Sequence, residues 1–556
     1  MRYTDSLTGM FASAMKEYWE LPALTEYGGE TKSYAQIAHT VARLHEFFRE
    51  VGIEPGDRVA LIGRNSINWV CGFVATVTYG AVVVPILHEF KASTVHAIVE
   101  FSGAKMLLTS QLVWETLSVE EMPSVRVIMA TDGWDVKAER MGRGIAGLVS
   151  AAQQRFRTRY PNGYRKEDVS YHEMVGDDLV EINYTSGTSG NPKGVMIPSR
   201  AMMSNMEFAE GVIPVKPGDR VLAVLPMAHA YGQAFDLLYA IGHGLHIFVF
   251  SKMPTPTVVI GAFKDVRPRY ILLVPLVFEK IYKLRIKPYV RKPLVRFSLR
   301  VPLLRLKVAG EFRKAVTEAF GGEFIEVIIG GAALNPEVER FFTRIGFRFT
   351  VGYGMTECAP IISYAPWANR KKYSAGRVTP NMEMRINKTA SHSEVGEIEV
   401  RGANVMLGYY NRPEATAEVM SEDGWLRTGD LGEIDAAGNL TIRGRCKNMI
   451  LGPTGQNIYP EEIEELLNNL PFVLESLVVQ DGNRLVGVAV WDEAACKRSR
   501  LSEEDFEAML KKALPRVNAE LPAYSQLAEL RMRQEEFEKT PKRSIMRYLY
   551  SLVGTR

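Results

Sequence analysis

The sequence predicts an α/β protein with a large N-terminal domain of layered α/β subdomains, a β subdomain, and a small, mobile α+β C-terminal domain. Through the first part of the chain, apolar strands alternate with helices, a pattern typical of a largely parallel sheet. With 556 residues, of which 46% are hydrophobic and 24% charged, the chain is globular and too long for a single core. The fold class is predicted from these two observations.

The first elements follow from hydrophobic periodicity. Residues 33–55 place apolar side chains at three- and four-residue spacing, which predicts an amphipathic helix. GDRVALIG at 56–63 supplies a short buried strand. Residues 66–88 lack Asp, Glu, Lys and Arg and are long enough for a membrane span, but Gly80 and Pro85 interrupt them. We therefore predict a buried helix at about 67–79, followed by a buried strand.

The next elements lead to a glycine- and hydroxyl-rich loop. Residues 141–178 are polar and rich in Gly and Arg, which predicts a loop or linker. Glu181–Tyr184 predicts the end of a strand, and Ser199 is a plausible N-cap for the helix that follows. The predicted order around residues 183–195 is therefore strand, loop, helix.

The loop itself, NYTSGTSGNPKGV, has the composition of a phosphate cradle. Glycines let backbone amides approach a ligand closely, and hydroxyls add donors that rotate to suit it. The Walker pattern is absent, because Pro192 and Gly194 flank the lysine, and composition alone suits a flexible Ser/Gly turn equally well. The candidate nucleotide-binding residues here are Thr185, Ser186, Gly187, Thr188, Ser189, Gly190 and Lys193.

The residue order YTSGTSGNPKG resembles the signature loop of the adenylate-forming superfamily, which comprises acyl- and aryl-CoA synthetases, peptide-synthetase adenylation domains and firefly luciferase. The resemblance extends over 33–550, and RPRYILLVPLVFEK at 267–280 is most like long-chain fatty acid–CoA ligases. It implies an enzyme that uses ATP and Mg²⁺ to convert a fatty acid to acyl-AMP, and then transfers the acyl group to coenzyme A as co-substrate.

Two further motifs take their roles from this resemblance. FIEVIIGGAAL presents backbone for a flat ligand, with Gly331 and Ala332 in the nucleotide site, and FTVGYGMTECAP follows it. The resemblance implies that Tyr353 stacks on adenine beside Gly354, and that Thr356 contacts the α-phosphate. It also implies that Glu357 ligates magnesium together with Thr185, and oxygen ligands are what a hard cation prefers.

Two more residues match the family position by position, and a third lies in a segment comparable to one of the family. Asp430 in WLRTGD offers a carboxylate to the ribose hydroxyls, and Arg445 in RGRCKN offers a fork to the nucleotide. His229 in LPMAHAYG falls where the family lines the pocket for the substrate carboxylate. A histidine at a helix start or in the core remains the alternative for His229.

The resemblance also sets the domain boundaries. It implies an adenylation domain at 1–446, with the β subdomain at about 376–446, and a C-terminal lid at 447–556 with its hinge at Lys447. A lid that presents different faces in turn serves both steps: adenylation needs a sealed site, and thioester formation needs room for the pantetheine thiol.

One departure from the family lies in the lid. The family's T-x-S-G-K-x-x-R segment is TPKRSIMR at 540–547, so Ser544 occupies the position of the lysine that reaches the reacting groups. Either Lys542 or Arg543 supplies the charge, or adenylation is slow or lost. We take Lys542 as the candidate catalytic residue, with Lys193, Thr356 and Glu357. The alternatives are an acyl-AMP ligase, an acyl-carrier-protein synthetase, and a nucleotide- or acyl-binding protein without turnover.

Charge and cysteine content bear on location and partners. The net charge of +3 gives no global attraction to nucleic acid, and the four scattered cysteines suit a reducing cytosol. No secretory signal is visible at the N-terminus. Residues 280–307, however, carry ten Lys or Arg and no Asp or Glu, interleaved with large apolar residues. This composition suits peripheral binding to an anionic membrane, and equally a solvated basic hairpin. Nucleic-acid binding is disfavoured, because the segment has few aromatic residues on which bases could stack.

Overall fold

The computed structural model divides the chain into two compact units. Of the described residues, the first contains those up to Thr185, Pro192–Glu383 and Val400–Leu426, and the second contains those in Met384–Glu399 and from Arg427 onward. This division falls inside the expected β subdomain, so the hinge at Lys447 stays a prediction. The structure describes residues 6–185, 192–252, 254–290, 292–298, 301–388, 394–451, 456–482, 484–540 and 544–550.

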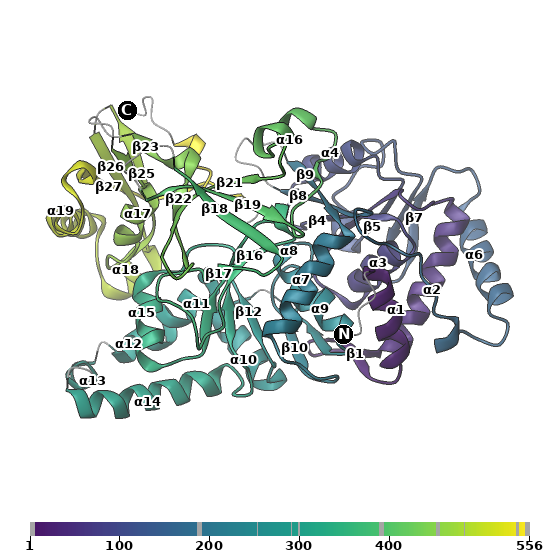
Figure 1. The fold of residues 1–556 in the computed structure, drawn as a ribbon, viewed down its shortest axis with the longest axis horizontal. Helices are drawn as coiled ribbons and strands as arrows, with labels where there is room; N and C mark the ends of the chain where they lie inside the picture. Colours follow the sequence, from purple (N-terminus) through teal and green to yellow (C-terminus); the bar gives the residue numbers. More distant parts are fainter. Residues whose placement is uncertain are drawn as a thin grey trace. The chain divides into compact units, whose positions relative to one another are not determined.

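An eight-stranded mixed sheet organises the first unit (Figure 1). Its central strands run parallel, as the alternation of strands and helices predicts, and antiparallel strands close both edges. The strands, in spatial order, are β20 (Gly408–Tyr409), β9 (Lys193–Pro198), β8 (Leu179–Thr185), β4 (Val82–Ile86), β3 (Arg58–Ile62), β5 (Met106–Thr109), β6 (Val127–Ala130) and β7 (Asp135–Glu139).

The predicted N-terminal elements are present. Helix α2 (Tyr34–Val51) begins at Ser33, whose hydroxyl accepts from the Gln36 amide while the Gln36 side chain accepts from the Ser33 amide. This capping box fixes the start of the helix, and Gly52 ends it in the left-handed conformation. Helix α3 (Ile67–Thr78) leads into β4, whose five residues are all buried. Within the described ranges, no helix is long and apolar enough to cross a bilayer.

Three local expectations were wrong. Residues 141–178 contain helix α6 (Ile145–Arg159), which buries only Leu148 and Ala152 and therefore shows little apolar periodicity. Strand β9 lies between the glycine-rich loop and the next helix, α7 (Ser199–Val212). Ser199 is the first residue of α7 and not its N-cap, because its hydroxyl donates to the Met174 carbonyl at 2.9 Å.

Smaller sheets complete the first unit. The sheet β12-β13-β14 is parallel, and β15-β16-β17 is antiparallel. A four-stranded sheet has the order β10-β11-β1-β2. The bounds are β1 (Pro22–Glu26), β2 (Thr31–Ser33), β10 (Arg220–Ala223), β11 (His246–Val249), β12 (Ile271–Leu273), β13 (Val327–Ile329), β14 (Phe349–Val351), β15 (Tyr353–Gly354), β16 (Ile361–Tyr364) and β17 (Arg377–Val378).

The remaining helices of the first unit cover these sheets. A core of aromatic side chains, including Phe278, Phe320 and Phe342, holds α10, α11, α14 and α15 against β12-β13-β14. The bounds are α1 (Leu7–Glu17), α4 (Ala92–Ser102), α5 (Gln111–Trp114), α8 (Ala230–Gly232), α9 (Tyr239–Gly242), α10 (Pro256–Val266), α11 (Pro275–Ile281), α12 (Lys287–Val290), α13 (Pro293–Ser298), α14 (Pro302–Ala319), α15 (Pro336–Ile345) and α16 (Pro413–Val419).

The second unit is α+β, as expected. It contains helix α17 (Pro460–Asn468) and strands β25 (Val473–Asp481) and β26 (Arg484–Trp491). Most residues of the four-stranded sheet β18-β19-β21-β22 also belong to this unit. The bounds are β18 (Met382–Asn387), β19 (Gly396–Gly402), β21 (Leu426–Ile434), β22 (Leu440–Arg445), β23 (Ile450–Leu451), β24 (Asn457–Ile458), α18 (Glu493–Ser499), α19 (Glu503–Ala519) and β27 (Leu527–Arg533).

Candidate active site

Two glycine-containing turns meet at one edge of the β12-β13-β14 sheet. Ile329 pairs with Val351 at the ends of parallel strands β13 and β14, so Gly330 and Tyr353 follow at the same edge. The Gly352 amide donates to the Ile329 carbonyl at 2.9 Å, which holds the two turns together. The expected adenine-side residues Gly331, Ala332 and Tyr353 are thus neighbours through strand pairing.

Backbone packing explains the glycines at this edge. Gly331 has φ +86°, a left-handed conformation that favours glycine, and it is exposed. A Cβ at Gly354 would lie 2.2 Å from the Pro360 carbonyl oxygen, because the YGMTE turn folds back tightly on strand β16. The turn then enters a 3₁₀ helix, Thr356–Cys358, in which Thr356 is buried and Glu357 is partly exposed.

Strands β8 and β9 flank the glycine-rich loop. Thr185 ends β8 and pairs with Lys193, the first residue of β9, so the two residues face each other across the mouth of the loop. A Cβ at Gly194 would lie 2.7 Å from the Ile182 side chain, so this position also requires glycine. The predicted residues Ser186, Gly187, Thr188, Ser189 and Gly190 lie outside the described residues.

Tyr409 links this loop to the YGMTE turn. Its hydroxyl donates to Glu357 Oε1 at 2.9 Å, and Lys193 Nζ lies 4.8 Å from the centre of its ring, over the ring face. Burial, followed by the adjacent Glu357 carboxylate, raises the pKa of Tyr409, so the hydroxyl remains a donor. A cation and a carboxylate therefore both contact one aromatic side chain, and Thr185 pairs with the residue that carries the cation.

Tyr409 is the site residue that sequence reasoning missed. It lies far along the chain from Lys193, in the segment VMLGYYNRPE. Its position depends on strand β20, which pairs antiparallel with β9 and places Tyr409 opposite Val195. Since β20 is two residues long, no hydrophobic period signals it, and Tyr409 and Tyr410 are indistinguishable in the sequence.

A buried carboxyl group lies behind the loop. Glu181 of β8 is fully buried, and its oxygens accept from the amide of Asn183 at 2.7 Å and from the amide of Gln233. Burial raises the pKa of Glu181 to about 7. Gln233 begins a π-helix (Gln233–Leu238) directly after α8. Strand β8 is thus hydrogen-bonded to the helical segment that begins at His229.

His229 itself caps that segment. It is the N-cap residue of α8, and its Nδ1 accepts from the Tyr231 amide at 3.3 Å. The Tyr231 hydroxyl donates to the Ile328 carbonyl at 3.0 Å, and a Cβ at Gly330 would lie 3.2 Å from the Tyr231 ring. His229 therefore lies at the start of a helix, which was the alternative to a role in the substrate pocket. Two residues later in the sequence, Tyr231 contacts the Gly330 turn.

In the second unit, Asp430 and Arg445 form an ion pair. They face each other on strands β21 and β22, and Arg445 Nε lies 2.9 Å from Asp430 Oδ1. The Asp430 side chain is 8% exposed and that of Arg445 is 59% exposed. The pair therefore presents an open guanidinium beside a shielded carboxylate, and Lys447 follows in a short 3₁₀ helix, Cys446–Asn448.

The described residues on either side of positions 541–543 are held together on the second unit. The Thr540 amide donates to the Ser544 carbonyl at 2.8 Å, and Lys539 and Ile545 form an antiparallel bridge. Arg547 is held on α17 by Glu464. Lys542 and Arg543 lie outside the described residues.

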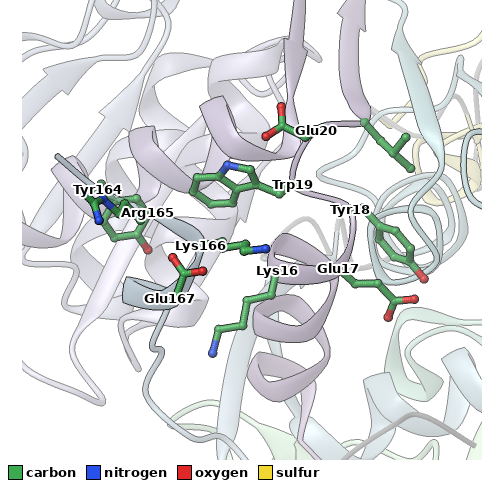
Figure 2. A pocket seen from close by; sticks show the side chains of 10 residues that line it. Lys16, Glu17, Tyr18, Trp19, Glu20, Tyr164, Arg165, Lys166 and Glu167 are labelled. Carbon is green, nitrogen blue, oxygen red and sulfur yellow. The ribbon is translucent and has the colours of Figure 1, made fainter.

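A surface hollow of about 500 Å³ lies elsewhere on the first unit, between the end of α1 and the segment after α6 (Figure 2). Trp19 and Tyr164 line it with ring centres 6.3 Å apart, among charged side chains such as Lys16 and Glu167. None of its lining residues belongs to the motifs above, so it is not the expected nucleotide site.

The fold and these motifs define an adenylate-forming enzyme. Residues 11–410 match the family model described as AMP-binding enzyme, and residues 447–551 match the model of the AMP-binding enzyme C-terminal domain. The chain belongs to the AMP-binding enzyme family, and its class is that of AMP-forming acid–thiol ligases.

Named relatives agree with this class, and a solved structure has a similar fold. The mouse long-chain-fatty-acid–CoA ligase ACSBG1 is 25% identical over 86% of this chain and 70% of its own. The Mycobacterium tuberculosis long-chain-fatty-acid–CoA ligase FadD15 is 27% identical over 79% of this chain and 74% of its own. The fold is similar to that of ATP-bound MatB from Rhodopseudomonas palustris, with a TM-score of 0.74, 21% identity and 98% of each chain covered.

Proposed function

We propose that this protein is a fatty acid–CoA ligase: it activates a long-chain fatty acid as acyl-AMP and transfers the acyl group to coenzyme A. The observation that carries the proposal is the position of Tyr409 between Lys193 and Glu357. The acyl substrate rests on the resemblance to long-chain ligases and on relatives named as such. ATP is the nucleotide that the family membership supports.

The donor groups suit magnesium. The Thr185 hydroxyl and the Glu357 carboxylate are hard oxygen ligands, and Mg²⁺ is usually bound through one or two protein oxygens, with nucleotide phosphates and water completing its shell. When bound, the ion offsets the charge of the phosphates. Tyr409 positions the Glu357 carboxylate through its hydroxyl, so Tyr409 has a positioning role toward the metal site.

In the first step, a carboxylate oxygen of the fatty acid attacks the α-phosphorus of ATP, and the bond to pyrophosphate breaks. Lys193 holds phosphate oxygens as their charge is redistributed, and Thr356 donates to the α-phosphate. Tyr353 stacks on adenine at the edge formed with Gly331, Ala332 and Gly354. Asp430 and Arg445 take the ribose and the nucleotide.

In the second step, the thiol sulfur of coenzyme A attacks the acyl carbon, AMP leaves, and the thiol proton is released. The first step needs water excluded and the second needs an open path for pantetheine, so we propose that residues 447–556 move as a lid about Lys447. Lys542, two residues before Ser544 in the sequence, supplies the positive charge to the first step in this proposal.

Direct product analysis tests this function. The protein is incubated with ATP, Mg²⁺, coenzyme A and fatty acids of medium and long chain, and AMP and acyl-CoA are separated by chromatography. We expect equal amounts of AMP and acyl-CoA. A Glu357→Gln variant should lose both products, whereas Glu210→Gln, at an exposed position of the same unit, should retain both.

The other outcomes identify the alternatives. Release of acyl-AMP with no thioester would identify an acyl-AMP ligase, and transfer only to a holo carrier protein would identify an acyl-carrier-protein synthetase. ATP binding without any product, for every carboxylate tried, would identify a binding protein without turnover. Ser544 at the family's lysine position is the observation that favours this last alternative.

A further inference from the structure

The segment between α11 and the second turn of α14 combines exposed apolar side chains with positive charge. Among the described residues, Leu284, Tyr289, Phe297 and Leu306 are 57–69% exposed, and Leu276 and Leu304 are 42–44% exposed. Six of the eighteen large hydrophobic side chains exposed in the described structure thus lie within residues 276–306. Residues 280–307 contain ten cations and no acid.

The first turns of α14 show that this exposure has a structural cause. Farther along α14, Ala309 and Val316 are buried and Phe312 packs on the core, as one face of a packed helix should. Residues 304–307 are all exposed, although four consecutive helical residues point in every direction around the axis. This end of α14 therefore extends past the helices α10 and α15 on which the rest of it packs.

The segment is nevertheless anchored. Lys287 forms an ion pair of 2.8 Å with Glu337 at the start of α15, and Tyr282 donates to the same carboxylate at 3.1 Å. Ile286 is buried, and α13 contacts both α12 and α14. Figure 1 shows α12, α13 and the start of α14 together at one edge of the first unit. The exposed side chains are thus presented on an attached helical platform.

We propose that the exposed side chains of residues 280–307, here called the basic apolar surface, dock the enzyme on an anionic lipid bilayer. Charge complementarity favours an anionic bilayer as the partner, because Lys292, Arg305 and Lys307 are exposed and negative headgroups attract them. Leucine and phenylalanine side chains enter the boundary between headgroups and acyl chains, as in interfacial helices.

Nucleic acid fits this surface less well. Stacking of bases needs aromatic faces, and among the exposed apolar residues here four are leucines, which offer none. The ring of Tyr289 is already covered by Lys292, whose Nζ lies 5.0 Å from the ring centre. An acidic protein would satisfy the cations but not the leucines.

Vesicle flotation tests the proposal with the full-length protein and without ATP, fatty acid or coenzyme A, so that its failure is separate from failure of the ligase function. The wild type should float with vesicles of phosphatidylcholine mixed with phosphatidylglycerol, and not with phosphatidylcholine alone. High salt should release it. Lys292→Gln/Arg305→Gln/Lys307→Gln should bind about 100-fold more weakly, because each cation near an anionic surface contributes about fivefold.

Two further variants sharpen the test. Phe297→Ser/Leu304→Ser/Leu306→Ser should also weaken vesicle binding, since the apolar contacts would be lost while the charge is unchanged. The matched control, Arg498→Gln/Lys511→Gln/Lys512→Gln, removes equal charge from exposed positions of the second unit and should bind like the wild type. All substituted positions are exposed, and thermal unfolding checks that each variant folds.

Several results would overturn the proposal. It fails if the wild type does not float with anionic vesicles, or if the control variant weakens binding as much as the variant in the basic apolar surface. It also fails if only the charged variant, and not the apolar one, loses binding. Binding to a single-stranded oligonucleotide in place of vesicles would make nucleic acid the occupant.

Discussion

The glycine-rich loop and the C-terminal TPKRSIMR segment are the two places where the sequence expects a positive charge for the reacting phosphate, and they are held in place differently. Lys193 lies on a paired strand, where a shift of one residue would turn its side chain to the other face. The C-terminal charge is expected from Lys542, which lies outside the described residues; of its neighbours, the Thr540 amide donates to the Ser544 carbonyl and Arg547 is held on α17.

The difference teaches how each site tolerates sequence change. A lysine on a strand is fixed by the register of the sheet, and Tyr409 and Glu357 are placed around it by the same pairing. The C-terminal segment is held on each side of positions 541–543 by the Thr540–Ser544 hydrogen bond and by the Arg547–Glu464 pair. We propose that the charge has moved from position 544 to position 542 while Arg547 keeps its contact with Glu464. The predictions below test this contrast.

The largest effect is expected at the strand. Lys193→Ala should lower the rate of fatty-acid-dependent ATP–pyrophosphate exchange by about 10³, the loss typical of removing a preorganised charge from a transition state. Lys216→Ala, an exposed lysine of the same unit, serves as the control and should exchange like the wild type. A loss of similar size in both variants would remove Lys193 from the site.

A smaller loss is expected at Lys542. Lys542→Ala should lower exchange by about 10², because it removes one positive charge from the reacting phosphate, and Arg543→Ala should lower it less. In the Lys542→Ala background, Ser544→Lys should restore most of the rate by returning the charge to the family's position. If Lys542→Ala has no effect on exchange, another residue supplies the charge, and the comparison of Lys193 with Lys542 is wrong.

The hydrogen bond from the Tyr409 hydroxyl links strand β20 to Glu357 of the YGMTE turn, and removing this hydroxyl tests the link. Tyr409→Phe removes the hydrogen bond to Glu357 and leaves the ring under Lys193, so kcat/KM for ATP should fall by about tenfold, as expected for a hydrogen bond to a charged group. Titrating Mg²⁺ should show a weaker apparent affinity. Tyr410→Phe is the control at the adjacent position, and an equal loss there would contradict the assignment of Tyr409.

The smallest effect on activity is expected at the buried Glu181, where a substitution should change the free energy of unfolding more than the rate. The pKa of Glu181 is raised to about 7 from its ordinary 4.5, so the folded state holds the proton more tightly than the unfolded state. The free energy of unfolding should therefore decline as pH rises from about 4.5 through about 7. Glu181→Gln should remove this decline relative to the wild type, measured by urea unfolding.

Glu210→Gln is the control for that measurement, because Glu210 is exposed on the same unit. Its unfolding should keep the pH dependence of the wild type. An unchanged pH dependence in Glu181→Gln would show that the buried carboxyl group titrates at its ordinary pKa.

Sequence reasoning succeeded where the signal is local. The helix after Ser33 carries its own capping box, and α3 and β4 carry uninterrupted apolar runs. It failed at α6, which buries two residues and contacts α2 partly through charge, as in the ion pair of 2.7 Å between Arg155 and Glu50. Charged contacts between distant helices leave no periodic pattern in a sequence.

For the candidate site, the motifs located residues but not their connections. Lys193 and Glu357 were identified individually, whereas their meeting at Tyr409 depends on the pairing of β20 with β9. The buried partners Glu181 and Gln233 were missed for the same reason, since they join a strand to a π-helix across the fold. Such contacts arise from tertiary structure, and no residue involved is unusual in its own segment.

The most direct test of the central claim is fatty-acid-dependent ATP–pyrophosphate exchange by the unmodified protein. It reports the adenylation step alone, whatever the thiol acceptor is. The account predicts exchange that requires both Mg²⁺ and a long-chain fatty acid, and that is lost in Lys193→Ala. Absence of exchange with every fatty acid, while ATP still binds to the protein, would contradict it.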